Sequence, residues 1–205
     1  MAGWDEPIAY VLRSSTAGYS AGAGLSQIDM LAFGMVVKAQ PNSNPQESVY
    51  GLLYDIHIDD DPLVRQLVLA EAVSEETIRD QRHHRIAPVE MSVLAIGYRD
   101  LDGGIRHALP PRPPVSLAPV YLCNDAETRE VTERFDYFRL VLSASDAPGE
   151  QLLAATLLRA AATRREQEQY EYLVRAGREA ARLLINDMAR LDYLLRLIYP
   201  YEVQP

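Results

Sequence analysis

The sequence predicts an α+β protein, in which a small, mainly antiparallel β-barrel precedes a C-terminal long-helix arm or helical hairpin. Strand-forming segments separated by turn residues recur between about residues 25 and 145, a pattern typical of small all-β units. Residues 150–198 contain no proline and one glycine, and their apolar side chains recur every three or four positions, as in an amphipathic helix. We therefore expect three parts: an N-terminal strand and flexible loop (1–24), a barrel (25–145) and a helical arm (146–205).

The N-terminal half supplies the first strands. Residues 7–12 are expected to pair as a strand, whereas residues 14–24, rich in Gly, Ser and Ala, are expected to form a flexible loop. Residues 33–38 (FGMVVK) and 50–57 (YGLLYDIH) predict two β segments. The stretch between them is rich in Pro and Asn, which is typical of a turn or mobile loop.

An acidic turn follows the second of these segments. Asp59, Asp60 and Asp61 precede a proline and interrupt the apolar run. Residues 63–72 fit either a strand or a helix, and the strand is the favoured interpretation. Ser74 and the two acids after it favour a short helix to about residue 83, because Ser is a good N-cap and carboxylates suit the positive helix end.

The pattern of residues 89–121 predicts a strand, a tight turn, a second strand, a corner and a third strand. Residues 91–98 (MSVLAIGY) are apolar, and the Asp-Gly-Gly at 102–104 supplies the positive φ that a short hairpin turn needs. Four prolines within residues 110–114 (PPRPP) cannot donate to a strand ladder, so this segment predicts a corner or an edge. Residues 127–141 are expected to combine a short helix with a strand that ends at residues 138–142.

The helical arm is expected to contain two helices, about 149–163 and 165–198. Asp146 can cap the first helix and Pro148 suits its first turn, whereas Pro200 ends the second. One apolar stripe runs along the second helix, and we expect it to contact more than one neighbour, including another subunit. The stripe consists of Leu173, Ala176, Ala180, Leu184, Met188, Leu191, Leu195 and Ile198.

The order of these elements resembles the HAS-barrel family, the N-terminal barrels of HerA-type hexameric DNA translocases, which are related to the ATP synthase barrels. The resemblance covers about residues 25–145 and is carried by three short motifs: residues 34–36 (GMV), residues 50–53 (YGLL) and the corner. Pro114 stands where the family pattern has a glycine. The ATPase domain of the translocases has no counterpart here, so the resemblance implies no ATP hydrolysis.

The resemblance implies a non-catalytic barrel or adaptor protein. In HerA-type translocases such barrels form a ring on the hexamer and offer a docking surface to the NurA nuclease. We therefore expect a homo-oligomer with an ATPase or nuclease partner in DNA end processing. The interaction residues are expected to be Leu173, Ala180, Leu184, Met188, Leu191 and Leu195 on the stripe, and Pro110, Pro111, Arg112 and Pro113 at the corner. The alternatives are a structural subunit of an unrelated assembly, or a metal-dependent enzyme that uses the loop of Asp59, Asp60 and Asp61.

Composition narrows the possible partners. The formal net charge is −9 and the pI is about 4.9, which disfavours strong direct binding to nucleic acid, since that affinity comes mainly from neutralised phosphates. No apolar run approaches the roughly 20 residues that a membrane helix needs, and the N-terminus lacks the pattern of a signal peptide. We expect a cytoplasmic protein without a membrane partner.

No motif predicts a catalytic, cofactor or metal site. The glycine-rich residues 18–24 lack the lysine and Ser/Thr of a phosphate-binding loop, and the aspartates lack the spacing of a calcium loop. The four histidines have no partners at metal-ligand spacing, and the single Cys123 favours a buried small hydrophobe. The corner is either a polyproline ligand or, the favoured interpretation, a structural corner.

Overall fold

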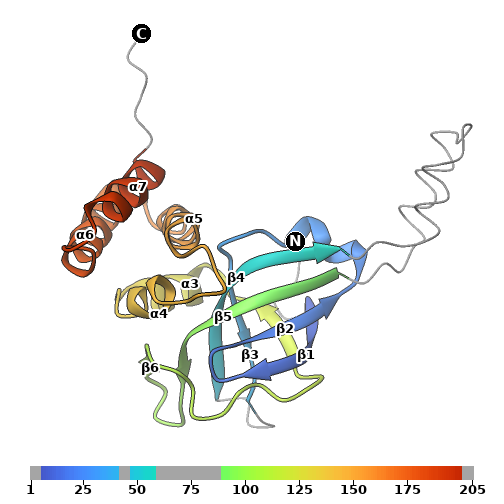
Figure 1. Ribbon diagram of the computed structural model, residues 1–205. Coiled ribbons are helices and arrows are strands. Elements are labelled where there is room, and N and C mark those ends of the chain that lie inside the picture. The colour runs from blue at the N-terminus through green and yellow to red at the C-terminus, as the bar shows by residue number, and fades with distance from the viewer. Residues whose placement is uncertain (1–5, 42–46, 59–88, 200–205) are drawn as a thin grey trace, which may run out of the picture.

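The computed structural model describes residues 6–41, 47–58 and 89–199 of the chain (Figure 1). The strands are β1 (Ala9–Ser15), β2 (Gly18–Ala23), β3 (Val36–Ala39), β4 (Ser48–Ile58), β5 (Val89–Arg99), β6 (Ile105–Arg106) and β7 (Pro119–Leu122), with a 3₁₀ turn η1 (Leu25–Met30). The helices are α3 (Asp125–Thr132), α4 (Phe138–Leu142), α5 (Gly149–Ala162), α6 (Glu166–Leu183) and α7 (Met188–Ile198). No helix in these ranges is long and apolar enough to cross a membrane.

Six strands close into an antiparallel barrel, which confirms the predicted fold class. The hydrogen-bonded order is β2-β1-β7-β3-β4-β5, and a direct pairing of β2 with β5 closes the ring. Strand β6 lies outside the ring and forms a hairpin with β5, whose turn contains Gly103 at a φ of 80°. The predicted hairpin, the two β segments before it and the proline corner are therefore all present.

Alternation along the strands creates two apolar cores. Inward side chains, such as Val37 on β3, Leu53 on β4 and Met91 on β5, fill the barrel and are almost fully buried. The outward side chains of the same strands, Tyr50 and Leu52 among them, are buried as well. Strand β4 is therefore covered on both faces, as expected for a strand between a barrel interior and a layer of helices.

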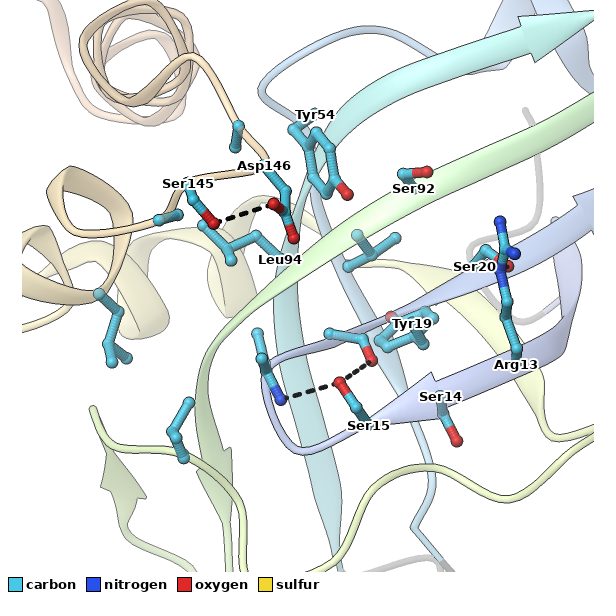
Figure 2. A pocket seen from close by; sticks show the side chains of 18 of the residues that line it. Arg13, Ser14, Ser15, Tyr19, Ser20, Tyr54, Ser92, Leu94, Ser145 and Asp146 are labelled. Carbon is cyan, nitrogen blue, oxygen red and sulfur yellow. Dashed lines mark hydrogen bonds between the residues drawn. The ribbon is translucent and has the colours of Figure 1, made fainter.

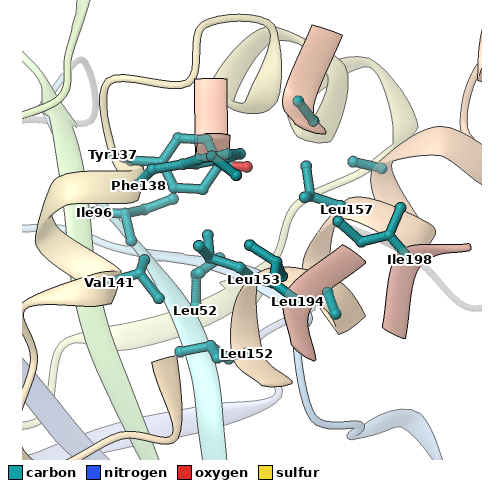
Figure 3. Packing of buried hydrophobic residues seen from close by; sticks show 14 of the residues in the cluster. Leu52, Ile96, Tyr137, Phe138, Val141, Leu152, Leu153, Leu157, Leu194 and Ile198 are labelled. Carbon is teal, nitrogen blue, oxygen red and sulfur yellow. The ribbon is translucent and has the colours of Figure 1, made fainter. Parts of the chain in front are cut away.

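The second core lies between the barrel wall and the helices. Figure 3 shows Leu52 and Ile96 of the barrel facing Leu152 and Leu153 of α5. Helix α5 is buried along most of its length because it packs on the barrel with one side and on α6 and α7 with the other (Figure 1). Its low amphipathicity has the same cause, since a helix between two layers is apolar around most of its circumference.

Residues 18–23 are strand β2, so the predicted flexible loop at 14–24 is wrong. Tyr19 and Ala21 point into the barrel and are buried, and the strand pairs with both β1 and β5. A Cβ at Gly18 would lie 2.2 Å from the carbonyl oxygen of Val93, so the close approach of the two backbones requires glycine. The barrel consequently includes β1 and β2 and begins at Ala9, well before residue 25.

Two further expectations about the C-terminal half are corrected. Residues 138–142 form helix α4 and not a strand, with Phe138 and Val141 on its buried side. The expected second helix is two helices, α6 and α7, because the chain turns at Leu184 and the side chain of Asp187 caps α7 by accepting a hydrogen bond from the backbone N–H of Arg190. The strand expected at 63–72 and the helix expected at 74–83 lie outside the described residues.

Gly34 joins the barrel to the helical layer. Its carbonyl oxygen accepts a hydrogen bond of 3.1 Å from Thr156 Oγ1 on α5, and the carbonyl of Phe33 accepts another from Arg159. Gly34 has a φ of 82°, and a Cβ there would lie 2.6 Å from the Cβ of Ala155. The helix can therefore approach the barrel only because residue 34 has no side chain.

We predict that Gly34→Ala lowers the free energy of unfolding by more than the roughly 1–2 kcal/mol that a left-handed backbone costs an alanine. The additional loss comes from contact with α5. Gly103→Ala is the matched control, because Gly103 has a φ of 80° but nothing within 4 Å of an added Cβ. Urea denaturation of both variants measures the difference, and equal losses would show that α5 does not press on Gly34.

Candidate interaction surfaces

The predicted helical stripe packs mainly within the chain itself. Ala180, Leu184 and Leu191 are at most 6% exposed, and Leu173 and Leu195 are partly buried against the same core. Met188, which is 65% exposed, is the one member that points clearly to solvent. The turn between α6 and α7 breaks the single straight helix that the sequence suggested, and α5 covers most of the stripe.

We predict that Leu184→Glu combined with Leu191→Glu unfolds the protein instead of dissociating an oligomer, because each substitution puts a charge into the core between the helices. Met188→Glu is the matched control on the same stripe and should change the free energy of unfolding by less than about 0.5 kcal/mol. Far-UV circular dichroism and thermal melting distinguish the two results. A folded, monomeric double variant would contradict the burial of this stripe.

The proline corner lines one side of a groove of about 400 Å³. Pro110 is buried and Pro113 half-buried, which holds the corner on the protein, whereas Pro111 and Arg112 are exposed. The β5–β6 hairpin forms the facing side, with Tyr98 in the groove and Leu101 exposed by 63% at the turn. The corner is thus a structural corner that also borders an open groove.

A second, more polar cleft of about 500 Å³ adjoins this groove. Arg99 organises it: the guanidinium donates to Glu130 of α3 at 2.6 Å, to the hydroxyl of Tyr50 at 3.0 Å and to the carbonyl of Gly103 at 2.7 Å. One arginine therefore ties helix α3 and strand β4 to the hairpin turn. These contacts fix the position of the hairpin turn relative to α3 and the barrel wall.

The lysine of the chain also has a structural role. Lys38 of β3 forms an ion pair with Glu127, whose other carboxylate oxygen accepts a hydrogen bond from the backbone N–H of Asn124. Asn124 in turn accepts from the backbone N–H of Glu127, which completes a capping box at the start of α3. The pair holds the N-terminus of α3 against the barrel wall.

The pKa values of Lys38 and Tyr50 in this cleft, and of the buried Cys123 outside its lining, are raised. Burial alone would lower the pKa of Lys38, but the hydrogen bond and charge of Glu127 raise it overall. Burial raises the pKa of Tyr50 against the opposing effect of Arg99, and burial also raises the pKa of the Cys123 thiol. Each shift favours the protonated form, whereas a nucleophile requires the deprotonated one.

His107 lies half-buried between the hairpin and the helical layer. Its Nδ1 is 3.2 Å from the carbonyl oxygen of Ile96, and its ring packs against Tyr137 with centroids 5.4 Å apart. Burial lowers the pKa of His107 despite the hydrogen bond to Ile96 and the charge of Asp136, and Arg134 also lowers it. The folded protein therefore favours the neutral imidazole.

We predict that the free energy of unfolding falls as the pH drops below about 6.5, the pKa of an unfolded histidine. The lowered pKa of His107 means that the unfolded chain takes up this proton first, so its contribution to stability is complete above pH 6.5 and is lost as the pH falls towards the folded pKa. Denaturation of the wild type and of His107→Gln between about pH 7.5 and 5.5 measures the effect. An equal slope in both proteins would contradict it.

The largest of these clefts, about 560 Å³, lies between the barrel wall and the α4–α5 connection (Figure 2). Six serines from four segments of the chain line it: Ser14, Ser15, Ser20, Ser92, Ser143 and Ser145. Most of these hydroxyls already bond within the protein; Ser14, for example, donates to the carbonyl of Pro114 at 2.6 Å. In Figure 2, Arg13 and Asp146 lie at opposite ends, and Arg13 is paired with Glu90 at 2.8 Å. The lining of the cleft has little net charge. Its serines are far apart in the sequence, so no sequence motif indicates the cleft.

The described residues contain no group of three or more His, Cys, Asp or Glu side chains placed to hold a metal ion. Asp59, Asp60 and Asp61 lie outside the described ranges, as do His83 and His84, so the predicted alternative of a metal site on that loop stays a hypothesis. The glycine-rich residues 18–24 belong mainly to strand β2, and their geometry is that of a barrel strand, not of a phosphate-binding loop.

A scan against models of known protein families finds no match, and a search of curated proteins finds no significantly similar sequence.

Proposed function

We propose that this protein is a non-catalytic adaptor, built on a HAS-type barrel, that joins a HerA-type translocase and a NurA-type nuclease in DNA end processing in the cytoplasm. The observation that carries the proposal is the open groove between the proline corner and the β5–β6 hairpin. The corner is one of the motifs on which the resemblance to the HAS-barrel family depends. Part of it remains exposed at the surface, in Pro111 and Arg112.

The groove is lined by rigid apolar groups and by charged ones, among them Asp100, Asp102 and Arg112. Prolines and Tyr98 give it rigid apolar walls, and Leu101 adds an exposed apolar side chain at the rim. Rigid apolar groups lose little conformational entropy when a partner binds. Arg112 forms no ion pair within the described part of the chain and is free to meet a carboxylate of a partner. The contacts of Arg99 hold the hairpin in place and thus preform the groove.

The charge of the chain supports recruitment through a protein partner. At a net charge of −9, direct binding to duplex DNA should be weak and should vanish at physiological salt, because released counterions supply most non-specific affinity. The shifted pKa values around Lys38 and Tyr50 support a structural role for the adjoining polar cleft.

We predict that the purified chain binds the purified HerA-type translocase or NurA-type nuclease of its own organism, and that Leu101→Ser weakens this binding at least about tenfold, as for an exposed apolar anchor of an interface. Leu158→Ser, at a 42% exposed position on α5, is the matched control and should bind normally. Biolayer interferometry measures both affinities. Absence of a complex with either protein would remove the adaptor role, and a complex with unrelated proteins only would favour a structural subunit of another assembly.

The same preparation tests the catalytic and nucleic-acid alternatives. ATP turnover by the chain alone should be undetectable, and fluorescence anisotropy should show no sub-micromolar binding to duplex DNA at about 0.15 M salt. Calorimetric titration with Mg²⁺, Mn²⁺ and Ca²⁺ tests the aspartate loop. Metal-dependent activity that is lost when Asp59, Asp60 and Asp61 are changed to Asn would favour the enzyme hypothesis.

A further inference from the structure

A row of polar side chains crosses four neighbouring strands of the barrel wall, on the face that borders the largest cleft. The strand register places Arg13 of β1 opposite Ser20 of β2, and Ser20 opposite Ser92 of β5. Tyr54 of β4 lies next to the position opposite Ser92, where the register of β4 and β5 shifts. All four residues line the cleft, and we refer to them as the polar row.

The register shift is a β-bulge, and Tyr54 is its extra residue. The neighbours of Tyr54 on both sides pair with consecutive residues of β5, whereas Tyr54 itself has no pairing partner. Bulges of this kind re-aim a side chain and are frequent next to functional sites. In Figure 2, the ring of Tyr54 lies between Ser92 on the barrel wall and Asp146 of the α4–α5 connection. The bulge thus brings an aromatic ring to the cleft.

The hydroxyl hydrogens of the polar row have no acceptor within the described part of the chain. Ser20 is only 4% exposed, and its hydroxyl accepts a hydrogen bond of 3.1 Å from Nε of Arg13 but donates none. The hydroxyls of Ser92 and Tyr54 form no hydrogen bond with any described residue. A ligand can therefore gain these hydrogen bonds without breaking one inside the protein.

The α4–α5 connection supplies an acceptor that faces this row. The carboxylate of Asp146 accepts a hydrogen bond of 2.9 Å from Ser145 but forms no ion pair with a described residue. At the other end of the cleft, Arg13 is already paired with Glu90. A phosphate would meet the negative charge of Asp146. An ammonium group, which only donates, would leave the hydroxyl hydrogens of the row without acceptors. The lining therefore matches a neutral ligand that both donates and accepts.

We propose that this cleft binds a neutral saccharide, with a mono- or disaccharide unit between the polar row and Asp146. Sugar hydroxyls accept from the hydroxyls of the row and donate to the carboxylate of Asp146. The C–H bonds on one face of a sugar ring pack against the electron-rich face of Tyr54. The volume of about 560 Å³ lies in the range of small-molecule sites. The inference goes beyond the proposed adaptor role and does not depend on it.

Saturation-transfer NMR with neutral sugars tests the site directly. A panel of glucose, galactose, mannose, N-acetylglucosamine, maltose and cellobiose should contain a ligand, and calorimetry then measures its Kd. Tyr54→Phe and Ser92→Ala should each weaken binding at least about fivefold, as expected for one lost hydrogen bond. Asp146→Asn should weaken it at least about tenfold, because hydrogen bonds to a charged acceptor are stronger.

Folding and binding are separated by the same hydroxyls. The melting temperatures of Tyr54→Phe and Ser92→Ala should stay close to that of the wild type, since neither hydroxyl has a partner among the described residues. Two matched controls should bind the sugar normally. Tyr170→Phe removes a tyrosine hydroxyl at a 70% exposed position on α6. Ser143→Ala removes a serine hydroxyl that lines the cleft but donates to the carbonyl of Leu140.

The source of the saccharide follows from chain length. Tighter binding of a longer homologue of the best ligand supports a glycan chain, whereas equal binding supports a free sugar. Failure of every panel sugar to bind at millimolar concentration would overturn the proposal, as would binding of propylammonium or inorganic phosphate in the cleft in place of a sugar. Sugar binding that Tyr54→Phe, Ser92→Ala and Asp146→Asn all leave unchanged would place the site elsewhere and overturn the assignment of this cleft.

Discussion

Burial of strand β4 on both faces is the constraint on which the rest of the structure depends. Leu53 faces the barrel interior, whereas Tyr50 and Leu52 face the helices, and all three are almost fully buried. A strand with two apolar faces cannot lie on the surface of an isolated barrel without exposing a large hydrophobic area. The helical layer is therefore part of the same folding unit as the barrel, not an arm that extends from it.

The contact between the barrel and the helical layer contains specific hydrogen bonds and an ion pair as well as apolar packing. Gly34 allows the backbone of α5 to approach, and Thr156 and Arg159 donate to the carbonyls of Gly34 and Phe33. The ion pair of Lys38 with Glu127 holds α3. Arg99 extends these contacts to the hairpin turn. Hydrogen bonds that link distant segments fix one relative placement of the layers, which hydrophobic burial alone does not do.

The distribution of exposed apolar residues follows from the same architecture. The helices cover β3, β4 and β5, so the outer wall at β1 and the segment before β7 stays in solvent. The turn between α6 and α7 directs Ile185 and Met188 outwards while the rest of the stripe is buried. Surfaces available for assembly are therefore those that the internal packing leaves uncovered. An apolar stripe in the sequence does not tell whether its residues are buried within the chain or against another molecule, because both kinds of burial have the same periodicity.

The sequence by itself determined the elements with strong local signals. The apolar strands before and after the hairpin, the Asp-Gly-Gly turn, the proline corner and the long amphipathic C-terminal region follow from β propensity, glycine and proline geometry and helical periodicity. Tertiary structure decided what local signals leave ambiguous. Residues 18–23 form a strand because β1 and β5 pair with them on both sides, and residues 138–142 form a helix because the second core needs Phe138 and Val141 on one face. The burial of Leu184 and the exposure of Leu117 likewise depend on neighbours distant in the sequence, and no window of the chain contains that information.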